Sequence, residues 1–188
     1  MDDPAFVHHV LDGLTKQRET EILNHMDGLK LDLVECGGGA GSSTVISPKM
    51  FEEFCIPYDR RINDALRSIG LRTVYHTCGG MMALLDLIPM NGTDATETLS
   101  PPAVGGDISH ECRTEVKRRL GERLPMIGGM NQALLDTGTP EQIKRDVQEC
   151  FEGFGSGGGY ICSASDHFFE SSIENLAALV RAAGECQY

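Results

Sequence analysis

A histidine and a cysteine two positions apart, His76 and Cys78, are the residues whose types and spacing best suit chemistry. They close a run rich in β-forming residues, and Gly79-Gly80 directly after them marks the end of a strand. Side chains at positions i and i+2 of a strand point to the same face, so the imidazole and the thiol are expected to stand together. A nitrogen and a sulfur side by side suit Zn²⁺, whose tetrahedral sites use such ligands. A packed histidine next to a buried cysteine is the alternative interpretation.

The elements that would carry these residues alternate between helix and strand along the chain. Cap-plus-proline signals at Asp3-Pro4, Ser47-Pro48 and Thr139-Pro140 predict helices that run to about residues 25, 68 and 151. Strands are expected over residues 31–36, 71–76, 95–99, 124–127 and 159–163. Strands separated by helices indicate an α/β fold with a parallel sheet. A complete (β/α)8 barrel takes about 250 residues, so these 188 residues suit either part of a barrel or a doubly wound sheet.

The composition limits the partners of the chain. It has 16 basic and 28 acidic side chains, and the resulting formal net charge of -12 repels phosphate backbones and anionic lipid. Neither nucleic acid nor a membrane is therefore an expected partner. The sequence has no run of about 18 apolar residues and no signal-peptide pattern, so we expect a cytoplasmic protein. The seven cysteines are odd in number and irregularly spaced, which argues against a disulfide framework.

Six short motifs occur in order along the chain. They occupy residues 46–51 with 56–57, 76–79, 128–131, 138–141, 158–161 and 174–176. Their order and spacing resemble the uroporphyrinogen decarboxylase superfamily, which also contains zinc-dependent methylcobamide:coenzyme M methyltransferases and related corrinoid methyltransferases. The resemblance implies that the chain is the C-terminal part, about five strands, of a TIM-type (β/α)8 barrel. It also implies that residues 1–188 are one barrel domain without the family's first three strands.

A barrel that lacks strands would leave two parallel sheet edges and an apolar interior uncovered, which native proteins rarely tolerate. We therefore expect a homo-oligomer in which chains share strands or helices, or a partner that supplies the missing wall.

The metal ligands follow from the resemblance to the methyltransferase branch, in which the His-x-Cys motif binds zinc. It implies that His76 and Cys78 are ligands. A third ligand in those enzymes is a cysteine in the loop after the last strand, but that loop contains no cysteine here. Cys162, Asp166 and His167 are all able to bind zinc, and Cys162 is slightly preferred because a thiolate preserves the ligand set.

Three further carboxylates have expected places. Glu97, at the end of a predicted strand, is a candidate fourth ligand that an incoming thiol would displace. The alternative is a carboxylate at the surface, or one that contacts a ligand without binding the metal. Glu35, also at a strand end, fits a catalytic carboxylate that faces the substrate, together with Asp166 and His167. Asp107 matches a family aspartate, although capping of the following helix would explain it equally well.

The resemblance to the methyltransferases also implies a function and its partners. A thiol bound to zinc takes a methyl group from a corrinoid that a separate protein presents. The corrinoid ring is expected to dock near Met81, Met82, Phe168 and Phe169, which are otherwise core or lid residues. The hypothesis is therefore a zinc-dependent methyltransferase that acts with a corrinoid protein and a small thiol.

Two alternatives remain. Uroporphyrinogen decarboxylation is disfavoured because it relies on basic N-terminal segments that the chain lacks, and because Asp166 stands where the decarboxylases have a histidine. A non-catalytic split or binding domain of the same superfamily is the other alternative.

Overall fold

Five short strands form one parallel sheet in the computed structural model, which describes residues 3–121 and 123–188. Its strands are β1 (Val34–Gly37), β2 (Thr73–His76), β3 (Ala95–Thr98), β4 (Met126–Met130) and β5 (Tyr160–Ala164). Strands that follow each other in the sequence are neighbours in the sheet, as in a barrel. In a doubly wound sheet the order of the strands reverses at a switch point. The predicted α/β fold with part of a TIM-type barrel is therefore confirmed.

The helices begin where their caps predict. α1 (Pro4–His25), α2 (Pro48–Phe54), α6 (Pro140–Phe154) and α7 (Ile173–Glu185) are each preceded by a side chain that accepts a hydrogen bond from a backbone N–H of the first turn. The helix predicted from residue 48 to 68 is wrong in one respect, because it breaks at Cys55 into α2 and α3 (Ile56–Ser68). Pro57 has no N–H to continue the first helix. α4 (Arg113–Leu120) and α5 (Ala133–Thr137) complete the set.

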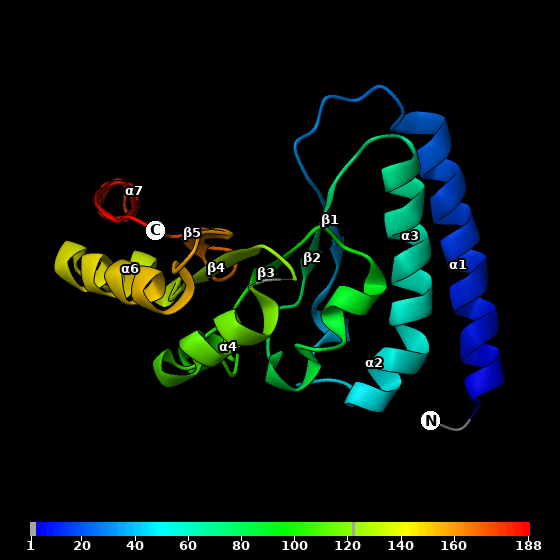
Figure 1. Ribbon diagram of the computed structural model, residues 1–188, viewed down its shortest axis with the longest axis horizontal. Coiled ribbons are helices and arrows are strands. Elements are labelled where there is room, and N and C mark those ends of the chain that lie inside the picture. The colour runs from blue at the N-terminus through cyan, green and yellow to red at the C-terminus, as the bar shows by residue number, and fades with distance from the viewer. Residues whose placement is uncertain (1–2, 122) are drawn as a thin grey trace.

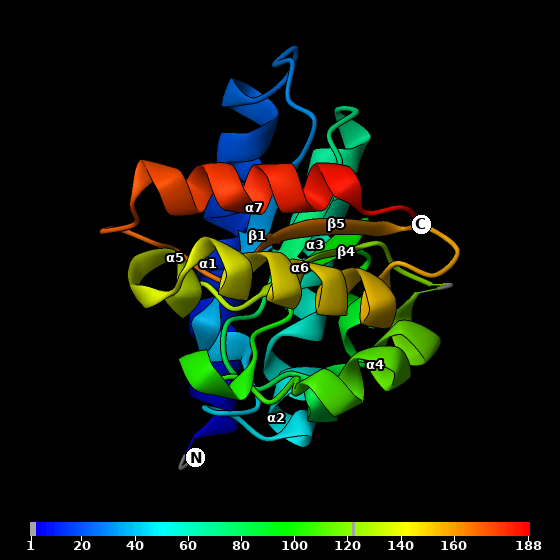
Figure 2. The same cartoon turned by 90° about the vertical axis from the view of Figure 1, so that its left-hand side faces the viewer.

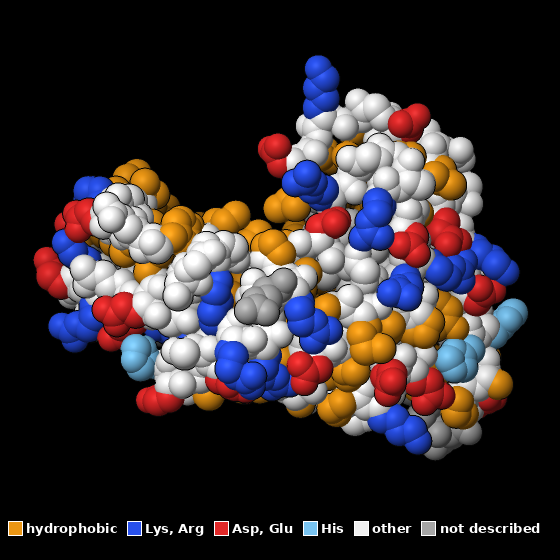
Figure 3. Space-filling view, in the orientation of Figure 1, with side chains coloured by type: hydrophobic (Ala, Val, Ile, Leu, Met, Phe, Trp, Pro, Cys, Tyr) orange, Lys and Arg blue, Asp and Glu red, His pale blue; other side chains and the backbone are white. Residues whose placement is uncertain are grey.

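The helices cover the convex side of the sheet and leave the concave side open (Figure 1). α6 and α7 pack against each other beside β4 and β5 (Figure 2). The core fills the layer between the sheet and these helices, where Tyr75, Met126, Val147 and Phe154 are almost fully buried. In space-filling view the open side is a hollow between the part of the molecule that ends in α7 and the part formed by α1 and α3 (Figure 3).

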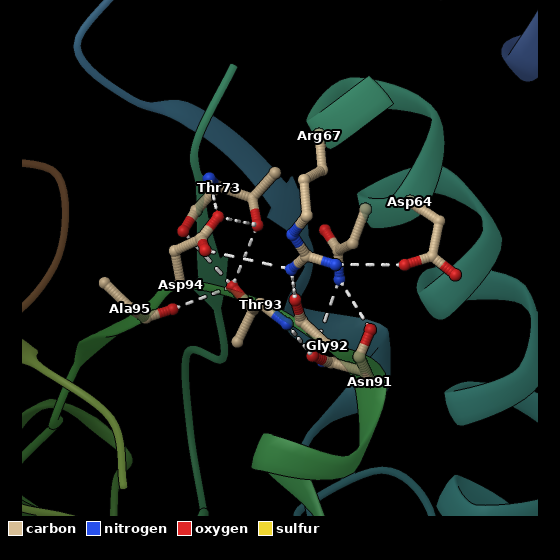
Figure 4. A network of polar contacts seen from close by, with 9 residues as sticks. Asp64, Arg67, Thr73, Asn91, Gly92, Thr93, Asp94 and Ala95 are labelled. Carbon is tan, nitrogen blue, oxygen red and sulfur yellow. Dashed lines mark hydrogen bonds and ion pairs between the residues drawn. The ribbon is translucent and has the colours of Figure 1, made fainter. Parts of the chain in front are cut away.

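A network of polar contacts ties β2 and β3 together at their N-terminal ends (Figure 4). The Asp94 carboxylate accepts a hydrogen bond of 2.8 Å from the backbone N–H of Thr73, and the Thr73 and Thr93 hydroxyls are 3.3 Å apart. Arg67 of α3 donates to the Gly92 carbonyl and lies 3.7 Å from Asp94. The N-terminal end of barrel strands serves stability, whereas chemistry is placed at the opposite end.

The two outer strands, β1 and β5, each pair with a single neighbour among the described residues. Beyond β1, α1 lies against α3, and Arg61 connects the two helices through hydrogen bonds of 2.8 Å to Asp12 and 2.9 Å to Glu19. Much of the apolar surface of α1 stays exposed, including Phe6, Leu14 and Leu23. None of the helices in the described ranges has the length and apolar character needed to span a bilayer.

Candidate metal centre

The C-terminal ends of β1, β2 and β3 bring Glu35, His76 and Glu97 together. The strand register places His76 opposite Glu97 on one side and Gly37 on the other, so alternate residues from all three strands point into the concave side. His76 Nδ1 lies 3.1 Å from Glu97 Oε1 and 3.8 Å from Glu35 Oε1. One ligand atom from each residue lies within 4.8 Å of the other two. This spacing suits a metal ion shared among the three side chains.

The His76 imidazole is the least accessible member of the cluster, with 12% of its side chain exposed against 23% for Glu97 and 60% for Glu35. Its pKa is raised to about 9, first by the hydrogen bond to Glu97 and then by the Cys78 side chain, while partial burial acts in the opposite direction. In the metal-free protein the ring is therefore protonated at neutral pH, and a metal ion must displace that proton.

Cys78 follows in the loop after β2, close enough to His76 for its side chain to raise the pKa of the imidazole. Its sulfur packs directly against the backbone of the loop after β1, because a Cβ added at Gly39 would lie 2.6 Å from Cys78 Sγ. The thiol thus lies near the imidazole but outside the group formed by Glu35, His76 and Glu97. The thiol is half-buried.

The loop after β5 forms the opposite wall of the same site. A cavity of about 300 Å³ is lined by Glu35, His76 and Glu97 together with Thr98, Ser163, Ala164, Asp166, His167 and Phe168. The His167 ring is nearly parallel to that of His76, with centroids 6.3 Å apart. The Asp166 carboxylate accepts a hydrogen bond of 2.7 Å from the His167 backbone N–H. Asp166 and His167 therefore line the same cavity as the cluster of Glu35, His76 and Glu97, as their place after the last strand suggested.

Three residues chosen from the sequence lie elsewhere. Cys162 does not join the cluster: it packs among the core residues beneath α6 and α7, and burial raises the pKa of its thiol to about 11. The reason is strand alternation, because the next residue, Ser163, is the one that lines the cavity. Met81 is completely buried and cannot contact a docked ring, and Met82 packs against the same core. Phe168 and Phe169 are exposed, as a docking surface requires.

A larger cavity of about 500 Å³ lies on the convex side, between α1 and the pair α2 and α3. Its walls are mostly apolar, and Asp59 is its carboxylate. Burial raises the pKa of Asp59 to about 6, although the carboxylate accepts a 2.7 Å hydrogen bond from the Tyr75 hydroxyl. Sequence reasoning missed this group, whose signal is an acidic residue on the apolar face of a predicted helix. The cavity lacks a set of metal donors, so the cluster on the concave side is the better candidate for chemistry.

The donors at the cluster fit zinc. They comprise one imidazole nitrogen and two carboxylates within 4.8 Å of one another, and the Cys78 thiol lies nearby, outside this group. Zinc binds all three ligand types and accepts four ligands in a tetrahedral site. Glu35, which we expected to face a substrate, is placed where it could be a ligand.

A partial parallel barrel with a donor cluster at the C-terminal ends of its strands defines a protein of the (β/α)-barrel class, whose sites lie at this end. The family model described as "Uroporphyrinogen decarboxylase (URO-D)" matches residues 3–186, so the chain belongs to this family.

Curated relatives come from two branches. The chain is 29% identical over 147 residues to the "Methylated-thiol--coenzyme M methyltransferase" of Methanosarcina mazei, which covers 78% of this chain and 36% of that protein. It is 31% identical over 120 residues to the "Uroporphyrinogen decarboxylase" of Pseudoalteromonas translucida, covering 62% and 31% respectively. The chain spans less than half the length of the curated relatives it matches.

Among solved structures, a "methyltransferase from Methanosarcina mazei" superposes with a TM-score of 0.72 at 21% identity. The superposition covers 91% of this chain and 47% of that one, and at this identity it shows the fold alone.

Proposed function

We propose that this chain is a zinc-dependent methyltransferase-like protein that moves a methyl group between a corrinoid, carried by a partner protein, and a thiol acceptor. The observation that carries the proposal is the arrangement of His76, Glu97 and Glu35 around one point, with the Cys78 thiol nearby. The names of the Methanosarcina relatives, which include "Methylcobamide:CoM methyltransferase MtbA", support the same chemistry.

In this proposal His76, Cys78 and Glu97 hold the metal, and Glu35 is the fourth protein ligand or yields its place to the acceptor. Zinc bound there would lower the pKa of a thiol that joins it. The chain's own residues have separate tasks. Glu97 orients the His76 ring through the 3.1 Å contact, and His167 and Asp166, on the facing wall, accept the proton that the thiol releases. Phe168 and Phe169 offer exposed aromatic surface for the corrinoid ring.

The experiment that tests the proposal measures metal and turnover in the same samples. Elemental mass spectrometry of the purified protein is expected to find about one zinc per chain. Cys78→Ala should lose most of it, whereas Cys112→Ala, which removes another half-buried thiol, should not. Methylcobalamin with a small thiol, followed by absorbance, should be demethylated by the wild type and by Cys112→Ala. Wild-type protein without zinc and without turnover would contradict the proposal.

Uroporphyrinogen decarboxylation is the second candidate, because curated decarboxylases match as much as 98% of this chain. That reaction needs no metal in the family. Conversion of uroporphyrinogen, measured by chromatography in the presence of a chelator, would favour it over methyl transfer. Zinc binding without either activity would instead favour a binding domain.

A further inference from the structure

The loop that carries Cys78 is held by a carboxylate from a different part of the chain. Asp107 lies in the segment after β3, and its Oδ1 accepts a 2.8 Å hydrogen bond from the Met81 backbone N–H. The Met82 N–H donates to both oxygens of the same carboxylate at 3.2 Å. Asp107 therefore does not cap the helix that follows it; it binds the chain three and four residues after Cys78.

Asp107 is itself in a fixed position. The next residue, Ile108, is 1% exposed, and its backbone N–H donates to the Ser100 carbonyl at 3.1 Å. On the other side, Gly106 packs so closely on Ser100 that an added Cβ would lie 1.8 Å from the carbonyl oxygen. The carboxylate is thus presented by a rigid turn, so its contacts can determine where the neighbouring loop lies.

A second contact holds the same loop from the side of β1. The Thr44 hydroxyl accepts a 2.7 Å hydrogen bond from the Gly80 N–H, and the Ser43 N–H donates to the Gly80 carbonyl at 2.8 Å. Between these contacts and the end of β2, the loop has little freedom. Gly79 has a φ of +96°, and a Cβ there would lie 2.9 Å from Thr44 Oγ1.

We propose that Asp107 is a positioning residue that, with Thr44, fixes the Cys78 thiol beside His76. The effect of Asp107 on metal affinity rests on the proposed function. Its effect on the position of the Cys78 thiol does not. Outer contacts that orient a ligand commonly change metal affinity by about 10- to 100-fold. Neither Asp107 nor Thr44 belongs to the cluster of Glu35, His76 and Glu97.

The first readout needs no metal. The chelator-treated protein is alkylated with iodoacetamide, and the rate at each cysteine is followed by peptide mass spectrometry. In Asp107→Ala the loop loses its hydrogen-bond acceptors, so the Cys78 rate should rise several-fold as the sulfur leaves its packed place against Gly39. The rates at Cys55 and Cys112 in the same sample should not change. Thr44→Val should also raise the alkylation rate of Cys78, and it provides the test if Asp107→Ala does not fold.

The second readout is Co²⁺ as a spectroscopic substitute for zinc. Asp107→Ala should bind Co²⁺ about 10- to 100-fold more weakly and lose intensity in the thiolate-to-metal absorption band. Asp107→Asn keeps one acceptor oxygen, so it should recover part of the Co²⁺ affinity and part of the band intensity. Ser172→Ala removes a comparable capping bond, 3.1 Å to the Asn175 N–H of α7, and should change neither.

The outcomes separate the two proposals. If the wild type binds no Co²⁺ or zinc, the proposed function fails, and the alkylation rates still decide the role of Asp107. If Asp107→Ala and Thr44→Val are folded and leave the Cys78 rate at the wild-type value, the positioning role is refuted.

Discussion

At the scale of single residues, the contact between His76 and Glu97 would link the proposed metal binding to pH. The pKa of His76 is raised to about 9, chiefly by the hydrogen bond to Glu97. A group whose pKa is raised in the folded state favours folding below its unfolded value of about 6.5, and that contribution disappears as the pH rises through 9. A metal ion competes with the same proton, so its affinity follows the opposite trend.

We therefore expect the affinity for zinc to rise with pH, by about tenfold per unit from this group alone, and to level off near pH 9. Calorimetry in buffers of different ionisation enthalpy counts the protons released. At about pH 7.5, Glu97→Gln should release about one proton fewer than the wild type, because the His76 pKa returns toward 6.5. Glu115→Gln, at an exposed residue paired with Arg118, is the control. Equal proton release in wild type and Glu97→Gln would contradict this coupling.

At the scale of the elements, β4 depends on glycine at a close crossing of two strands. Gly128 has a φ of +117°, and a Cβ there would lie 2.3 Å from the Thr98 carbonyl oxygen of β3. Any side chain would both strain the backbone and push the strands apart. By contrast, Gly13 in the middle of α1 has open space around it.

Gly128→Ala should accordingly lower the free energy of unfolding by about 2 to 5 kcal/mol. Gly13→Ala, the same chemical change, should raise it by about 0.5 to 1 kcal/mol, because alanine favours a helix more than glycine does. Urea denaturation followed by circular dichroism measures both. A neutral Gly128→Ala variant would show that β3 and β4 tolerate a wider spacing than the structure has.

The elements were predictable because their signals are local. Ser47, Thr139 and the prolines after them predicted helix starts, and short runs with β-forming residues predicted the strands. The break at Cys55 was missed because a proline inside a periodic run allows either a kink or a new helix. The face of Cys162 was missed because one residue of register decides it, and register is set by pairing with β4. The contacts of Asp107 join segments about 25 residues apart, which no local pattern encodes.

At the scale of the whole molecule, the open sheet leaves apolar groups without neighbours. Ile161 on β5 is 56% exposed, and Leu31 and Leu33, before β1, are also exposed. Exposed apolar side chains beside a free strand edge are typical of an association site. We propose that residues 1–188 act as one barrel domain that associates with other copies of itself.

Light scattering coupled to gel filtration should therefore give a mass that is a multiple of 20.4 kDa and that falls on dilution. Ile161→Lys, which places a charge on the open side of β5, should shift the population toward the monomer. Gln148→Lys adds the same charge to the exposed surface of α6 and should not. A mass of 20.4 kDa at every concentration would contradict self-association.

The polar network around Asp94 has a practical consequence for anyone who redesigns this protein. Its members hold the N-terminal ends of β2 and β3 in register. None of them belongs to the cluster of Glu35, His76 and Glu97 at the C-terminal ends of the strands. Residues for stability and residues for chemistry thus lie at opposite ends of the same strands. Substitutions at the N-terminal ends of the strands can be used to seek a more heat-resistant variant. Residues at the C-terminal ends can then be changed separately to obtain a different reaction.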